Sequence, residues 1–397
     1  MKKFPSDFKW GTSTSAYQIE GGNDNSNWEV WAKNQNITPA GIACDSFKRY
    51  PEDIELMKSM NLNSYRFSIE WARIEPQDGM WDIKALDYYK DLIMRLNENG
   101  IEPFVTLFHY TLPLWVENIG GFENKQTIKY FVRFSEFIAE NLQGSVKYFI
   151  TVNEPVLFAS LSYFRGYWPP CKKNIFKFFK VKRNLEKAHI SAYKKIKDIY
   201  EKYEWNEPQI SVSKNIFDLK AMDIISFVYC KGLDYILNYS FLDHTKDYLD
   251  FIGLNFYFHD EISLFRKDIL LHSNGSIEYS NKNNKQSYNF YPESIFNVLQ
   301  VLYKRYKKDI YITENGISDS TDKIRSRYIN EYLSSIYRAI KNGIPVKGYF
   351  YWTLIDNFEW LDGFNAKFGL AFIKNGKRIL KRSGKDFSNI VKRNGLL

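Results

Sequence analysis

The sequence predicts an α/β fold in the form of a single (β/α)₈ barrel, the TIM barrel. Extended runs rich in β-branched and aromatic residues alternate eight times with segments whose apolar residues recur at helical spacing. No Pro-rich or Ser-rich linker separates two halves of the chain. One closed barrel that occupies residues 1–397 is therefore favoured over two doubly wound sheets.

The strands are predicted where a short β-branched or aromatic run is bounded by polar or turn-forming residues. The run YFITVN, for example, follows a lysine and ends at a Glu-Pro pair, and the run DIYITE ends at Asn-Gly. In chain order, the eight strands are expected at residues 8–17, 63–69, 101–108, 147–153, 209–215, 249–256, 309–314 and 346–353.

The helices are predicted between these strands, where apolar residues recur every three or four positions. Pro51 and Pro292 stand near two helix starts, and Gly100 and Gly343 follow two helix ends, as is usual for these residues. Residues 258–291 show little periodicity and are expected to form a loop after the sixth strand. The helices are expected at 51–61, 84–99, 124–142, 184–203, 222–240, 292–306, 323–342 and 380–394.

The composition excludes several classes of protein. Hydrophobic residues at 44% and charged residues at 25% indicate a folded globular chain. No apolar run reaches the roughly 18 to 20 residues of a membrane span, and the first residues, MKKFPSDFKWGTS, contain no apolar signal segment. We therefore expect a cytoplasmic protein with no membrane partner.

The cysteines and histidines give no metal-binding pattern. Three cysteines stand far apart without a CxxC pair, and five histidines show neither HxH nor HExxH spacing. Idle or buried thiols are the simpler interpretation of the cysteines. We expect no metal and no cofactor.

The net charge of +9 is compatible with nucleic acid, an anionic surface or anionic substrates, but also with solubility alone. Only residues 171–184, CKKNIFKFFKVKRN, combine basic and aromatic residues densely. An amphipathic loop or helix start that covers the core explains this stretch at least as well as a binding strip does. No nucleic-acid partner is expected, and the sequence leaves the oligomeric state open.

Two glutamates end predicted strands. Glu154 closes the fourth strand in YFITVNEP, and Glu314 closes the seventh in DIYITENG. A lone glutamate at a strand end is more often a surface residue or a helix cap. Here, however, the ends of other strands supply planar polar and aromatic groups at the same rim of the barrel, where TIM-barrel active sites form. These groups are Asn153, His109, Asn255 and Trp352.

Two convergent carboxyl groups can hydrolyse a glycosidic bond without a metal, because one delivers a proton and the other places negative charge beneath the anomeric carbon. Their environments must differ. Arg66, in the second strand, is the expected partner that keeps Glu314 ionised, while a desolvated Glu154 near another anion would stay protonated. Planar polar groups around an aromatic platform are also typical of sugar sites.

The chain resembles glycoside hydrolase family 1, the β-glucosidase and β-galactosidase family, from end to end. FKWGTSTSAYQIEGG resembles the family's N-terminal signature, TVNEP its acid/base motif, YITENG its nucleophile motif, and GYFYWTLIDNFEW its C-terminal sugar-binding motif. Four motifs in the right order make the resemblance specific.

The resemblance implies a retaining β-glycosidase for terminal glucosyl, galactosyl or fucosyl residues, with Glu154 as the general acid/base and Glu314 as the nucleophile. Arg66 and Tyr257 would hold the nucleophile, and Asn255 would support Glu154. The glycone pocket would comprise Gln18, His109, Asn153, Glu359 and Trp360, with Trp352 as its floor.

The chain also departs from the family, because it is shorter by several tens of residues near the aglycone side. Trp168 and Tyr288 are the candidates for aglycone contacts. Glu359 followed by Trp360 is the family pattern for unmodified sugars rather than phospho-sugars. The alternative hypothesis is a catalytically weak or non-catalytic sugar-binding barrel with trimmed loops. The sequence does not decide the preferred glycone or the aglycone.

Overall fold

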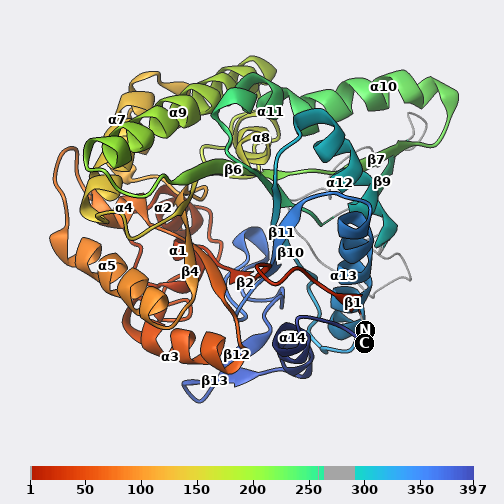
Figure 1. Cartoon of the computed structure of the whole chain (residues 1–397). Coiled ribbons are helices and arrows are strands. Elements are labelled where there is room, and N and C mark those ends of the chain that lie inside the picture. Colours follow the sequence, from red (N-terminus) through yellow and green to blue (C-terminus); the bar gives the residue numbers. More distant parts are fainter. Residues whose placement is uncertain (1, 258, 263–290) are drawn as a thin grey trace.

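The computed structural model describes residues 2–257, 259–262 and 291–397. Its centre is a closed barrel of eight parallel strands, in the order β2, β3, β4, β5, β6, β8, β10, β11, with β11 pairing back to β2 (Figure 1). The sequence order of the strands is thus their order around the barrel. The predicted (β/α)₈ TIM barrel is confirmed.

The barrel strands occupy all eight predicted positions. The first is shorter than the predicted 8–17, because residues from Ala16 onward turn into the short helix α1 (Ala16–Ile19). The strands are β2 (Lys9–Ser13), β3 (Ser64–Ser68), β4 (Glu102–Phe108), β5 (Tyr148–Asn153), β6 (Gln209–Asn215), β8 (Ile252–Asn255), β10 (Ile310–Asn315) and β11 (Val346–Trp352).

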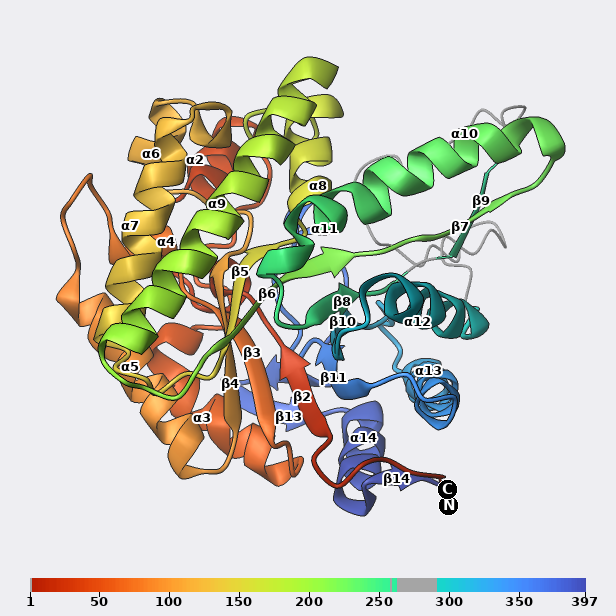
Figure 2. The same ribbon diagram turned by 45° about the horizontal axis from the view of Figure 1, so that its top comes forward.

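The eight predicted helices are all present and surround the barrel, as both views show (Figures 1 and 2). Gly100 and Gly343 follow two of them with φ of 68° and 78°, a left-handed conformation that glycine adopts without strain. The helices are α3 (Ser46–Ser59), α5 (Ile83–Glu98), α7 (Gln126–Asn141), α9 (Ile175–Lys202), α10 (Ile224–Asp234), α12 (Glu293–Tyr306), α13 (Arg325–Lys341) and α14 (Arg382–Arg393).

Three predicted helix boundaries were wrong. Helix α3 begins before Pro51, which lies inside it next to a kink at Arg49. The predicted 222–240 helix continues through a π turn, η3 (Tyr235–Tyr239), into α11 (Ser240–Thr245). The predicted 184–203 helix begins at Ile175, because the Asn174 side chain accepts hydrogen bonds from the next turn and caps it.

The basic stretch 171–184 forms the start of α9 and covers the core, as one of its two interpretations predicted. Phe178 and Val181 are buried, whereas Phe176 is 81% exposed and Lys180 is exposed. Within the described ranges, no helix combines the length and the apolar character that a membrane crossing requires.

Short strands outside the barrel were not predicted. β1 (Lys2–Lys3) pairs with β14 (Gly395–Leu396), so the N- and C-terminal ends of the chain lie side by side (Figure 1). β7 (Asp218–Ala221) pairs with β9 (His259–Ile262) and, together with α10, projects away from the barrel (Figure 2). β12 (Ala371–Lys374) and β13 (Lys377–Leu380) form a hairpin.

An aromatic layer fills the barrel below its mouth. The rings of Phe104 and Tyr148 stack with centroids 4.1 Å apart. Gly11 lets this layer close, because a Cβ there would lie 2.5 Å from the Phe350 ring. The layer consists of Phe104, Tyr148, Ile150, Phe251, Tyr311 and Phe350. It forms a dry floor under the polar residues at the strand ends.

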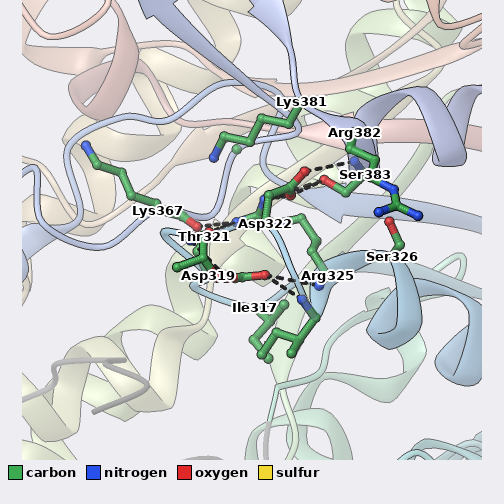
Figure 3. A network of polar contacts seen from close by, with 12 residues as sticks. Ile317, Asp319, Thr321, Asp322, Arg325, Ser326, Lys367, Lys381, Arg382 and Ser383 are labelled. Atoms are coloured by element: carbon green, nitrogen blue, oxygen red, sulfur yellow. Dashed lines mark hydrogen bonds and ion pairs between the residues drawn. The ribbon is translucent and has the colours of Figure 1, made fainter. Parts of the chain in front are cut away.

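A buried ion network holds the loop that follows β10 (Figure 3). Arg325 is fully buried, forms an ion pair with Asp322 and donates to the carbonyl oxygen of Lys367 at 2.5 Å. Asp319 accepts from the backbone N–H of Arg325 at 3.2 Å, and Asp322 accepts from the backbone N–H of Ser383 at 2.9 Å. The network therefore ties this loop to the C-terminal segment.

We expect Arg325→Met to lower the free energy of unfolding by about 3 kcal/mol, because removal of one partner leaves a buried carboxylate without its cation. The matched control is Arg327→Met on the same helix. Arg327 is 71% exposed on its side chain and pairs with Glu331, so its loss should cost about 0.5 kcal/mol or less. Urea unfolding curves measure both. Equal losses in the two variants would contradict the role of the network.

Candidate active site

Glu154 and Glu314 both lie at the carboxyl end of the barrel, and each is 4% exposed. Glu314 is in β10, and Glu154 follows β5 directly. Glu154 occupies the N-cap position of α8 (Pro155–Ala159), but its side chain forms no capping hydrogen bond. The helix-cap explanation of Glu154 is therefore wrong, and both carboxyl groups are available for chemistry.

Arg66 holds Glu314 in place. The Arg66 side chain is fully buried, and its Nη1 donates to Glu314 Oε1 at 2.5 Å. Tyr257 Oη donates to the other carboxylate oxygen at 2.7 Å. Both expected contacts are present, so one guanidinium and one phenol hold the two oxygens of Glu314 by charge-assisted hydrogen bonds.

Glu154 has no arginine or lysine within ion-pair distance among the described residues. Asn255 Nδ2 donates to Glu154 Oε1 at 2.7 Å, as predicted, and Tyr110 Oη donates to Oε2. Burial, followed by the negative charge of Glu314, raises the pKa of Glu154 from its ordinary 4.5 to about 7. Glu154 can therefore hold a proton near neutral pH.

Asn153 connects the two carboxyl groups. Its Oδ1 accepts from Arg66 Nη2 at 2.7 Å and from Asn255 Nδ2 at 3.1 Å, so its Nδ2 is the donor toward His109 Nε2 at 3.2 Å. Burial lowers the pKa of His109 well below its ordinary value, and the nearby Arg66 adds to this effect. The neutral ring then carries its proton on Nδ1, which is buried without a partner among the described protein atoms and can donate to a bound hydroxyl.

The remaining predicted glycone residues come from the end of β11 and the segment after it, from α1 and from the loop after β4. Trp352 Nε1 donates to Glu359 Oε1 at 3.0 Å, and Gln18 Nε2 donates to the backbone oxygen of Phe358 at 2.6 Å. The ring of His109 stacks with those of Trp352 and Trp360, at centroid distances of 5.9 and 6.2 Å. Burial raises the pKa of Glu359 well above its ordinary value. The structure thus brings together all the predicted glycone residues.

Trp360 belongs to an aromatic cluster with Tyr17, Trp28, Tyr110 and Trp168. Trp168 is 2% exposed, so the contacts of this predicted aglycone residue are with other protein rings, and its role toward an aglycone stays a prediction. The second aglycone candidate, Tyr288, lies outside the described residues.

Sequence reasoning missed three residues that support the site. They are Tyr110, which donates to Glu154; Thr106, whose Oγ1 accepts from Arg66 Nε at 3.2 Å; and Thr313, whose Oγ1 donates to Asn255 Oδ1 at 2.7 Å. Each lies in a barrel strand or immediately after one. The sequence could have indicated these residues only by their position in or close to a barrel strand. The same criterion would also have selected several residues that do not support the site.

The backbone is strained at three of these positions. Tyr110, Glu154 and Trp360 have φ of 75°, 43° and 47°, in the left-handed region that residues other than glycine rarely adopt. Such strain persists where surrounding contacts fix the conformation, and it concentrates at functional sites.

The site therefore contains one carboxyl group that is paired with Arg66 and a second, Glu154, that can stay protonated. An anion and an acid on facing strands suit the cleavage of a bond whose leaving group needs a proton. Within the described ranges, no group of three or more His, Cys, Asp and Glu side chains could hold a metal ion.

Known proteins similar to this chain are glycosidases. The model of glycosyl hydrolase family 1 matches residues 1–221 and 236–396. Beta-glucosidase A of Thermotoga maritima is 31% identical over all of this chain and 99% of its own length. A 6-phospho-beta-galactosidase of Staphylococcus epidermidis is 31% identical over 94% of each chain. A solved structure, the beta-glucosidase from Thermotoga maritima in complex with deoxynojirimycin, has a TM-score of 0.89 with 30% identity over 100% of both chains.

The two carboxyl groups should respond oppositely when each is neutralised. Because the pKa of Glu154 is raised from 4.5 to about 7, the folded state keeps a proton that the unfolded chain loses, and stability falls as pH rises through this range. Glu154→Gln should therefore stabilise the protein above pH ~7, by on the order of 2 kcal/mol, with little effect near pH ~4.

The control is Glu314→Gln, which should destabilise the protein at pH ~7.5, because it leaves the buried Arg66 unpaired. Thermal unfolding of both variants from pH ~4 to ~8 tests this contrast. Destabilisation by Glu154→Gln that does not change with pH would contradict the assigned protonation states.

Proposed function

Because the chain belongs to glycosyl hydrolase family 1 and is a glycoside hydrolase, we propose that it is a retaining β-glycosidase. It releases terminal non-reducing β-D-glucosyl, galactosyl or fucosyl residues. The observation that carries this proposal is the asymmetry of the two carboxyl groups, since Arg66 pairs with Glu314 and leaves Glu154 without a cation within ion-pair distance among the described residues.

In the first step, Glu314 attacks the anomeric carbon and forms a covalent glycosyl-enzyme. Glu154 gives its proton to the departing glycosidic oxygen at the same time, so the leaving group departs as a neutral alcohol. This mechanism requires a separation of about 5 to 5.5 Å between the two carboxyl groups, whereas inversion requires roughly 6.5 to 9.5 Å.

In the second step, water attacks the glycosyl-enzyme. Glu314 is now an ester without charge, so one of the causes that raise the pKa of Glu154 has gone. Glu154, which has given up its proton, acts as the base that deprotonates the water. The sugar leaves with the β configuration that it had in the substrate, because it has been inverted twice.

The glycone pocket is formed around a floor provided by Trp352. Asn153 binds the 2-hydroxyl group, and the Nδ1–H of His109 donates to a neighbouring hydroxyl. Gln18 and Glu359 bind the hydroxyl groups farther from the scissile bond, where glucose and galactose differ by the orientation of one hydroxyl. A carboxyl and an amide can bind this hydroxyl in either orientation, so we expect the protein to act on both β-glucosides and β-galactosides.

We also propose that residues 1–397 act as one catalytic domain in the cytoplasm, with a small β-glycoside or oligosaccharide as substrate. Trp168 is proposed to form part of the aglycone side through the aromatic cluster to which it belongs. No cofactor takes part in this mechanism.

Unphosphorylated sugars are the proposed substrates, although one relative is named 6-phospho-beta-galactosidase. Among the described residues proposed for the glycone pocket there is no lysine, and the one arginine, Arg66, is already paired with Glu314. A phosphate in this pocket would lie without a cation next to Glu359, which is costly. We expect kcat/KM for nitrophenyl 6-phospho-β-galactoside to be at least ~100-fold below that for the unphosphorylated sugar, as initial rates measure. A preference for the phosphorylated sugar would contradict this assignment.

The function is tested with nitrophenyl β-glucoside, β-galactoside, β-fucoside and β-mannoside. The wild type should release nitrophenol from at least one of them, and Glu314→Ala should abolish the release. Glu154→Gln should lower the rate about 10² to 10⁴-fold on poor leaving groups, spare the first step on dinitrophenyl glycosides and recover with azide. NMR should show the β anomer as the first product.

The matched control is Glu102→Gln at the opposite end of β4, which should keep normal activity. A folded wild type that turns over none of the four glycosides would favour the non-catalytic sugar-binding alternative. An α anomer as first product would contradict retention.

A further inference from the structure

Lys214 is a buried lysine in β6 that the proposed mechanism does not use. It is 0% exposed, and its Nζ donates to the backbone oxygen of Asn215 and to Asn215 Oδ1, the latter at 2.9 Å. Both partners are neutral, and within the described ranges no carboxylate lies within 4.0 Å of this ammonium group. A buried cation without a direct counterion is costly, so a structural role alone explains Lys214 poorly.

The residues on either side of Lys214 contact the acid/base end of the site. The backbone N–H of Glu154 donates to the carbonyl oxygen of Ser213 at 2.7 Å. Asn215 pairs with Asn255 on the adjacent strand β8, and Asn255 Nδ2 donates to Glu154 Oε1 at 2.7 Å. Lys214 therefore lies between a residue that binds the Glu154 backbone and a residue paired with the partner of the Glu154 side chain.

Several charged and polar groups surround Glu154 and Lys214. Burial and the charge of Glu314 raise the pKa of Glu154, whereas the hydrogen bonds from Tyr110 and Asn255 and the charge of Lys214 lower it. Lys214 in turn feels Glu154 and, from α9, Lys182. Lys182 is itself paired with Glu186 at 2.6 Å, and Glu154 is a carboxylate whose charge acts on Lys214.

We propose that Lys214 is a positioning residue for the acid/base, acting as a remote buried cation that stabilises the ionised form of Glu154. This inference rests on the proposed function. In the first step Glu154 must be protonated, and in the second it must be an anion, after Glu314 has lost its charge. A cation at Lys214 favours the ionised form of Glu154 in both steps. It therefore assists the second step, in which Glu154 acts as a base, and narrows the pH range over which Glu154 is protonated for the first step.

The pKa values agree with this coupling. Burial lowers the pKa of Lys214 to about 7, and the charge of Glu154 opposes this effect. Lys214 also opposes the burial that raises the pKa of Glu154. Lys214 and Glu154 thus each favour the charged form of the other, because their charges are opposite and the effect between two coupled groups is mutual.

The test is a direct titration of the two groups by NMR, which does not require turnover. The Glu154 carboxyl carbon is followed in ¹³C-glutamate-labelled protein and assigned by its absence in Glu154→Gln. In Lys214→Met its titration midpoint should rise by about 1 pH unit, whereas Lys214→Arg should keep it within a few tenths. Lys9→Met, in barrel strand β2 at the end away from the site, should leave the midpoint unchanged.

The reciprocal titration covers the case in which Lys214→Met does not fold. In wild-type protein with labelled lysine, the Lys214 side chain should titrate near neutral pH, and Glu154→Gln should lower its midpoint. An unchanged Glu154 midpoint in Lys214→Met, or an unchanged Lys214 midpoint in Glu154→Gln, would overturn the proposal, because a lysine with only a structural role would change the stability and not these midpoints.

Activity then separates this proposal from the proposed function. If the wild type is active, the alkaline limb of its kcat/KM profile should move to higher pH in Lys214→Met by the same interval as the Glu154 midpoint. If the wild type is inactive, the proposed function fails, while the NMR titrations still decide whether Lys214 sets the protonation of Glu154.

Discussion

The ion pair between Arg66 and Glu314 is the interaction on which the organisation of the barrel mouth depends. Two buried carboxyl groups and one buried guanidinium cannot all be charged without cost, and the guanidinium of Arg66 pairs with Glu314 rather than with Glu154. The second Nη group of Arg66 fixes the amide of Asn153, which then orients the proton on His109. The side chain of Arg66 therefore fixes the position of Glu314 and, through Asn153, the nitrogen on which His109 carries its proton.

The rest of the fold keeps this contact dry and fixed. The layer with Phe104 and Phe350 closes the barrel beneath the site with apolar side chains. The Arg325 network anchors the loop that follows Glu314, and the cluster around Trp360 supports the segment after β11. In water, the same charges would attract each other far less and would not distinguish the two carboxyl groups.

The sequence was sufficient for the parts of the molecule that local pattern encodes. The barrel, Glu154, Glu314 and the Arg66 contact follow from strand runs that end in polar residues. Tyr110 did not, because its side chain reaches Glu154 only through a left-handed turn, with φ of 75°, that no hydrophobic period encodes. The early start of α9 was missed for a related reason: its cap, Asn174, stands in a charged stretch that also fits a loop.

Lys214 shows where pattern reasoning fails in principle. It stands in a predicted strand, where a single lysine is normally taken as a residue that faces water, yet it is completely buried. Its burial follows from the helices that cover β6, a tertiary fact that no short window contains. If a site needs a proton donor that becomes a base within one cycle, a remote cation suits it better than a direct ion pair. A direct ion pair, such as the one that Glu314 forms with Arg66, would favour the ionised form of the acid and remove it from the first step.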